Sequence, residues 1–114
     1  MPLLRITTNQ PIDDIVKTRF LQLASSETAS LLGKPEEYVM VILEHNPDML
    51  FAGSSEALAS VELKSLGLPH SKTAEFSASL CSFINEQLDI AEDRIYIEFS
   101  DPPRHFWGWN GTTF

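Results

Sequence analysis

Residues 36–43, Glu-Glu-Tyr-Val-Met-Val-Ile-Leu, and residues 92–99, Glu-Asp-Arg-Ile-Tyr-Ile-Glu-Phe, lie 56 positions apart in this 114-residue chain. In each segment, apolar residues extend over about the length of one β-strand. The continuous apolar run at 38–43 is typical of a strand buried on both faces. The same shift aligns Phe20 with Phe76, Leu32 with Leu88, Glu36 with Glu92, Val39 with Ile95, Val41 with Ile97 and Leu43 with Phe99. The chain therefore contains an internal repeat, approximately residues 2–44 and 58–100.

The first repeat predicts a strand, a helix and a second strand. Residues 3–7 form a short apolar strand pattern, and the stretch after Pro11 changes to steps of three and four residues. The apolar face of that helix comprises Val16, Phe20, Leu23, Ala24 and Leu31. Asp13 and Asp14 suit the positive N-terminal end of a helix, and Gly33 is a stop signal.

The second repeat follows the same order. Residues 57–65 alternate in polarity as a strand does, and Ser71 is a candidate cap for the helix that follows. The apolar stripe of this helix comprises Phe76, Leu80, Phe83, Ile84 and Leu88. Residues 94–99 predict the last strand.

Together the repeats predict an α/β fold (α+β in some schemes), a tandem β-α-β unit in one domain of residues 1–114. Two helices cover one face of a four-stranded sheet. The other face, with apolar side chains from residues 38–43 and 95–99, then needs a cover. A closed homo-oligomer would bury that face and protect the strand edges.

Composition excludes several classes of partner. The formal net charge is -8, from 8 Lys+Arg against 16 Asp+Glu, which disfavours nucleic acid and anionic membranes. The three histidines, His45, His70 and His105, show no metal-ligand spacing, and no cofactor motif is present. The lone Cys81 lies in an apolar run and predicts core packing. We expect a cytosolic protein, with export by an unconventional route as the alternative.

Pro2 is the one candidate for chemistry that remains. Removal of Met1 would turn the Pro2 nitrogen from an amide into a secondary amine. Burial and a nearby cation would lower the pKa of that amine, and a neutral amine is a usable general base. Many proteins begin with Met-Pro without being catalytic, so this dipeptide alone leaves both interpretations open.

Several short motifs together resemble the macrophage migration inhibitory factor family of the tautomerase superfamily. They recur in the family's order over nearly the whole chain: Pro2, residues 33–35 (Gly-Lys-Pro), Tyr38, residues 53–56 (Gly-Ser-Ser-Glu), residues 65–67 (Ser-Leu-Gly), residues 93–97 (Asp-Arg-Ile-Tyr-Ile) and residues 108–114 (Gly-Trp-Asn-Gly-Thr-Thr-Phe). The resemblance implies a homotrimer with three sites at subunit interfaces.

The resemblance also implies the chemistry. The activity would be keto–enol tautomerisation of phenylpyruvate-like α-keto acids, with weak action on D-dopachrome-type substrates. Pro2 would be the base, while Lys34 and the backbone N–H of Leu66 would hold the substrate carboxylate. Tyr96 of a neighbouring subunit would contact the substrate. The aromatic rim would be formed by Tyr38 and Trp107.

The sequence departs from the family pattern at several positions. Glu98 stands where the vertebrate factor has an asparagine, and a carboxylate there would repel an anionic substrate. Trp107 replaces a smaller aliphatic residue, which predicts weak activity on bulky ring substrates. Leu58 and Val61 occupy the positions of a Cys-x-x-Cys motif, so thiol–disulfide chemistry is not expected.

The resemblance leaves a second interpretation open. The chain could be a cytokine-like protein that binds a CD74-like receptor ectodomain and keeps the pocket as a relic. Other tautomerase-superfamily reactions, such as dehalogenation or decarboxylation, are disfavoured because the extra site arginines are not evident in the sequence. If Met1 stays attached, the Pro2 nitrogen has no basic lone pair.

Overall fold

A mixed four-stranded sheet in the order β2-β1-β3-β4 forms the centre of the computed structural model, which describes residues 1–114. The main elements are β1 (Pro2–Thr8), α1 (Asp14–Leu32), β2 (Met40–His45), β3 (Ala59–Ser65), α2 (Thr73–Leu88) and β4 (Ile95–Ser100). A C-terminal hairpin follows, with β5 (Gly108–Trp109) and β6 (Thr112–Thr113), and short 3-10 turns join the elements: η1 (Glu36–Tyr38), η2 (His70–Lys72), η3 (Glu92–Arg94) and η4 (Arg104–Phe106).

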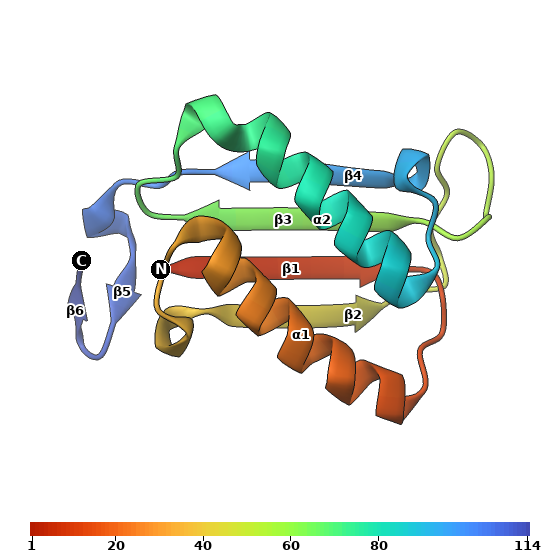
Figure 1. Ribbon diagram of the computed structural model, residues 1–114, viewed down its shortest axis with the longest axis horizontal. Helices are drawn as coiled ribbons and strands as arrows, with labels where there is room; N and C mark the ends of the chain where they lie inside the picture. Colours follow the sequence, from red (N-terminus) through yellow and green to blue (C-terminus); the bar gives the residue numbers. More distant parts are fainter.

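The strand pairing confirms the predicted tandem β-α-β fold. β1 pairs parallel with β2, and β3 pairs parallel with β4, while β1 and β3 run antiparallel at the centre of the sheet. Both helices lie on the same face of the sheet (Figure 1). Pro2 lies opposite Ser65, so the start of β1 meets the ends of β3 and β4 at one end of the sheet.

Local sequence explains where the helices begin and end. The Asp13 side chain accepts a hydrogen bond from the Val16 N–H at 2.9 Å and caps α1. Gly33 ends α1 with φ 62°, a left-handed conformation that glycine adopts without a Cβ clash. The prediction that Ser71 caps the second helix is wrong, because residues 70–72 form η2 and α2 begins at Thr73.

The core lies between the helices and the sheet. Alternate residues of the two central strands, including Leu4, Ile6 and Leu63, have no exposed surface. Phe20 of α1 and Phe83 of α2 contact each other with ring centroids 5.4 Å apart. Burial of each such side chain contributes about 1.5–3 kcal/mol, so this layer supplies most of the stabilisation.

The other face of the sheet differs from the prediction. Val41, Leu43, Ile97 and Phe99 pack against the core on the helix side, and the opposite face presents Arg5, Glu62, Lys64 and Glu98 among its residues. Strand alternation thus turns part of the expected apolar set toward the helices, whereas Met40, Ile42 and Tyr96 lie on the uncovered face beside these charged residues, so the prediction is correct only in part.

β2 also differs from the strand expected at residues 38–43. It is an edge strand with Met40 60% exposed, and Tyr38 belongs to η1 rather than to the strand. The apolar run at residues 38–43 therefore does not correspond to a strand that is buried on both faces of the sheet within this chain. None of the helices has both the length and the apolar character that crossing a membrane requires.

Candidate functional site

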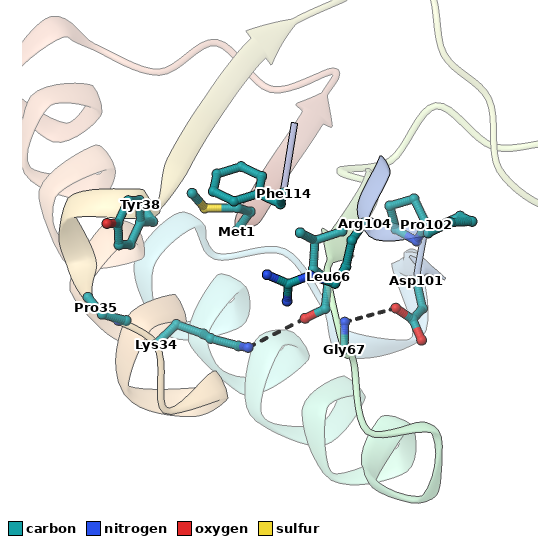
Figure 2. Close-up of a pocket in the computed structure, with 11 residues that line it drawn as sticks. Met1, Lys34, Pro35, Tyr38, Leu66, Gly67, Asp101, Pro102, Arg104 and Phe114 are labelled. Atoms are coloured by element: carbon teal, nitrogen blue, oxygen red, sulfur yellow. Dashed lines mark hydrogen bonds between the residues drawn. The ribbon is translucent and has the colours of Figure 1, made fainter. Parts of the chain in front are cut away.

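A cavity of about 580 Å³ opens at the end of the sheet where β1 begins (Figure 2). Its walls come from segments far apart in the sequence: Met1, Lys34, Pro35, Tyr38, Leu66, Gly67, Asp101, Pro102, Pro103, Arg104 and Phe114. A smaller cavity of about 330 Å³ shares Met1, Tyr38 and Phe114 with it and is also lined by Pro2 and Trp107. Both volumes suit a small organic molecule.

The chain terminus lies where these cavities meet. Pro2 is the first residue of β1 and its side chain is almost fully buried. Burial lowers the pKa of the Met1 amine, and the positive charges of Lys34 and Arg104 lower this pKa further. An amine at this end of the chain is therefore biased toward its neutral, basic form.

Lys34 reaches the cavity because of the way α1 ends. After the left-handed Gly33, the Lys34 N–H donates to the carbonyl of Ala29 at 3.0 Å, which turns the chain back on the helix. The Lys34 Nζ then donates to the carbonyl of Leu66 at 3.4 Å (Figure 2). The structure thus brings Lys34, Leu66 and the chain terminus to one cavity.

Aromatic side chains form one wall. The Tyr38 ring meets that of Trp109 edge to face, with centroids 5.7 Å apart, and Trp109 stacks on Phe114 at 5.8 Å. The Phe114 N–H donates to the carbonyl of Trp107 at 3.2 Å, which holds the C-terminal hairpin against the site. Tyr38 and Trp107 line the cavities, and Trp109 and Phe114 are additional aromatic residues.

Tyr96 and Glu98 lie elsewhere in the chain. Tyr96 is opposite Ser60 in the sheet, toward the end remote from Pro2, and its ring lies 4.5 Å from that of Phe51. Its side chain is 71% exposed. Glu98 is exposed, two residues further along the same strand, and lines neither cavity. Within one chain these two residues are not part of the site.

Comparison with known proteins decides the family. The family model described as "Macrophage migration inhibitory factor (MIF)" matches residues 1–114. The chain belongs to this family. It is 32% identical to the macrophage migration inhibitory factor of Rattus norvegicus and 37% identical to the homologue of Brugia malayi, in each case over 100% of this chain and 99% of the relative.

A solved structure of the family agrees with the fold. The macrophage migration inhibitory factor homologue from Prochlorococcus marinus superposes with a TM-score of 0.91 and 45% identity, covering 98% of each chain. Membership of the macrophage migration inhibitory factor family places the chain in the tautomerase superfamily, in which isomerase activity is expected.

Sequence reasoning missed two charged residues of this site. Arg104 lines the larger cavity from η4, although no extra site arginine was evident from the sequence pattern. Asp101 accepts a hydrogen bond from the Gly67 N–H at 2.9 Å through Oδ1 and contacts His70 Nε2 at 2.9 Å through Oδ2. The bond to His70 is the main cause that lowers the pKa of Asp101. Asp101 fixes the turn that presents Leu66.

The chain has no reactive thiol at the positions considered in the sequence analysis. Burial raises the pKa of the Cys81 thiol, which keeps it protonated and unreactive. Leu58 and Val61, at the positions of the family's Cys-x-x-Cys motif, are 3% and 1% exposed and belong to the core.

Proposed function

We propose that this protein, once Met1 is removed, is a keto–enol tautomerase of phenylpyruvate-like α-keto acids with Pro2 as the general base. The observation that supports this most is the setting of the terminal amine, in a cavity beside Lys34 and Arg104 where burial and charge both lower its pKa. The Pro2 nitrogen would lie one residue deeper than the Met1 amine, next to the almost fully buried Pro2 ring.

The reaction moves one proton and needs no cofactor. The Pro2 amine takes a proton from the carbon next to the ketone, and the resulting Pro2 ammonium returns this proton to the carbonyl oxygen as the enol forms. Lys34 holds the substrate carboxylate by charge, and the N–H of Leu66 adds a hydrogen bond. Tyr38 and Trp107 flank the aromatic ring of the substrate.

The proposed site is completed in a homotrimer. Because Tyr96 and Glu98 are exposed on the sheet face that the helices leave uncovered, we propose that a neighbouring subunit supplies them. Glu98 would weaken binding of anionic substrates, and Trp107 would narrow the pocket. We therefore propose modest activity with phenylpyruvate and weaker activity with D-dopachrome-type substrates.

The decisive experiment compares phenylpyruvate tautomerisation by protein whose intact mass confirms loss of Met1 with that by Pro2→Gly. We expect kcat/KM to fall by about 10²-fold or more, the contribution typical of general acid–base catalysis. The exposed Pro47 provides the matched control, because Pro47→Gly should leave the rate unchanged. Equal rates for Pro2→Gly and the parent would contradict the assignment of the base.

An inactive parent protein would contradict the tautomerase proposal itself. A receptor-binding role would then become the leading alternative. Binding of a purified CD74 ectodomain to the parent and to Pro2→Gly would test that role directly, since it does not depend on the amine.

A further inference from the structure

Two cations share the larger cavity although they come from different parts of the fold. Lys34 follows the C-terminus of α1, and Arg104 lies in η4 after β4. Figure 2 shows the Lys34 ammonium and the Arg104 guanidinium both directed into the cavity near Met1 and Leu66. One cation is sufficient for a single substrate carboxylate, so the second requires its own explanation.

Neither cation has a carboxylate partner. The ion pairs of the molecule are Arg5–Glu44, Lys17–Asp14 and His70–Asp101, although the chain has 16 acidic residues and 8 Lys+Arg. In so acidic a chain, two unpaired cations at one cavity form a local positive region that attracts anions.

The acidic residue of this cavity does not neutralise them. Both Asp101 oxygens are engaged, one by the Gly67 N–H and the other by His70, each at 2.9 Å. In Figure 2 the Asp101 carboxylate points toward Gly67 and away from Lys34 and Arg104. The Lys34 Nζ contacts only an uncharged carbonyl, that of Leu66.

We propose that Arg104 forms a second anion subsite and that the larger cavity binds α-keto dicarboxylates whose two carboxylates lie a few bonds apart. One carboxylate contacts Lys34, and the other accepts the two parallel N–H bonds that a guanidinium offers. The keto–enol part of this assignment rests on the proposed function, whereas the dicarboxylate part rests on the two cations alone.

Charge balance favours a dianion over a monoanion. With a neutral terminal amine, two cationic side chains face the ligand, and neither forms an ion pair with Asp101 or with the C-terminal carboxylate of Phe114. The Trp107 side chain does not narrow this space, because Trp107 lines only the smaller cavity, whereas Tyr38 and Phe114 line both. A short dicarboxylate can therefore bind in the larger cavity without contacting Trp107.

The test compares two four-carbon ligands of the same cis geometry that differ in one carboxylate, maleate and cis-crotonate (hereafter crotonate), by isothermal titration calorimetry on protein without Met1. We expect maleate to bind about tenfold or more tightly than crotonate, as charge-assisted pairing with Arg104 implies. In Arg104→Met this preference should disappear through loss of maleate affinity, and Arg104→Lys should keep part of it. The exposed Arg19 supplies the control, since Arg19→Met makes the same charge change away from the cavity.

Two results would overturn the proposal. Equal affinities for maleate and crotonate in the parent would show that there is no second subsite. An equal loss of both ligands in Arg104→Met would show that Lys34 and Arg104 hold one carboxylate together. Calorimetry needs no turnover, so these results remain distinct from a failure of Pro2 as a base, which the Pro2→Gly rates report.

Discussion

The two ends of the sheet are built from matching positions of the repeat, yet they differ in polarity. Gly33 and Asp89 end α1 and α2 in the same left-handed conformation, with φ 62° and 56°. The next residue is Lys34 at one end and Ile90 at the other. Lys34 is half-buried at an open cavity, whereas Ile90 has no exposed surface and belongs to the core.

In the next matched pair, Tyr38 and Arg94, the polarity is reversed. The aromatic side chain lies at the end with the cavity, and the charged side chain lies at the other end. Tyr38 lines the cavities with its ring and makes an aromatic wall. Arg94 donates hydrogen bonds to four backbone carbonyls, those of Phe51, Ser54, Glu56 and Ala57, at 2.7–3.4 Å. Its guanidinium thus fixes a long loop instead of meeting a ligand.

The comparison teaches that the same backbone arrangement can form a ligand cavity or stabilise the fold. The side chains at a few matched positions decide which of these it does. An open end with unpaired cations costs stability but attracts anions. A closed end gains stability from burial and satisfied carbonyls. Exchanging the side chains between the ends tests this division.

The largest effect on stability is expected when Ile90, at the closed end, is replaced by lysine, the residue at the matched position of the open end. Ile90→Lys places an unpaired ammonium in the core and should lower the free energy of unfolding by about 3–5 kcal/mol. Urea denaturation measures the loss. Ile90→Val should cost about 0.5–1.5 kcal/mol, and similar losses for both variants would contradict the closed character of this end.

Next in size is the loss of the loop clamp. Arg94→Met removes charge-assisted hydrogen bonds to half-buried and exposed carbonyls and should destabilise the protein by about 1.5–3 kcal/mol. Limited proteolysis should then cut the segment 46–57 faster than in the parent. Unchanged cleavage and an unchanged denaturation midpoint would mean that the loop is held by other contacts.

The reciprocal exchange should affect activity rather than stability. Lys34→Ile removes a cation near the amine, so the amine pKa rises and the ascending limb of kcat/KM should move to higher pH. We also expect KM for phenylpyruvate to rise about tenfold, with little change in the free energy of unfolding. A pH profile that coincides with that of the parent would show that Lys34 does not act on the base.

The smallest effect concerns Asp101. Its pKa is lowered by His70 and the Gly67 N–H, so its stabilising contribution is present at neutral pH and is lost as pH falls through that lowered value. NMR titration of the Gly67 amide should give a midpoint below the ordinary aspartate value of about 3.9. His70→Ala should move this midpoint upward, and a midpoint that stays in place would exclude the His70 contact as its cause.

Much of the fold could be predicted because the repeat supplies each element twice. The 56-residue shift revealed two β-α-β units, and the alternation predicted over residues 57–65 agrees with the buried residues of β3. The apolar run at residues 38–43 was misleading about burial, since a run does not show which neighbours a strand has. Only the sheet order places β2 at an edge.

The site was less predictable. Pro2, Lys34, Leu66, Tyr38 and Trp107 were reached through the family resemblance and do lie together at one end of the sheet. Arg104 carries no local pattern that marks it as a site residue, because its position depends on how the chain turns after β4. Tyr96 and Glu98 cannot be assigned to a site from one chain.

By itself, the sequence determined the tandem repeat, the helix ends at Asp13 and Gly33, the acidic character and the candidate base at the terminus. These features depend on periodicity, capping and composition, which act over a few residues or in sum. The tertiary structure alone decided that Lys34 and Arg104, 70 positions apart, face one cavity while Tyr96 does not. Such convergence follows from strand order and chain direction, which local residue patterns do not encode.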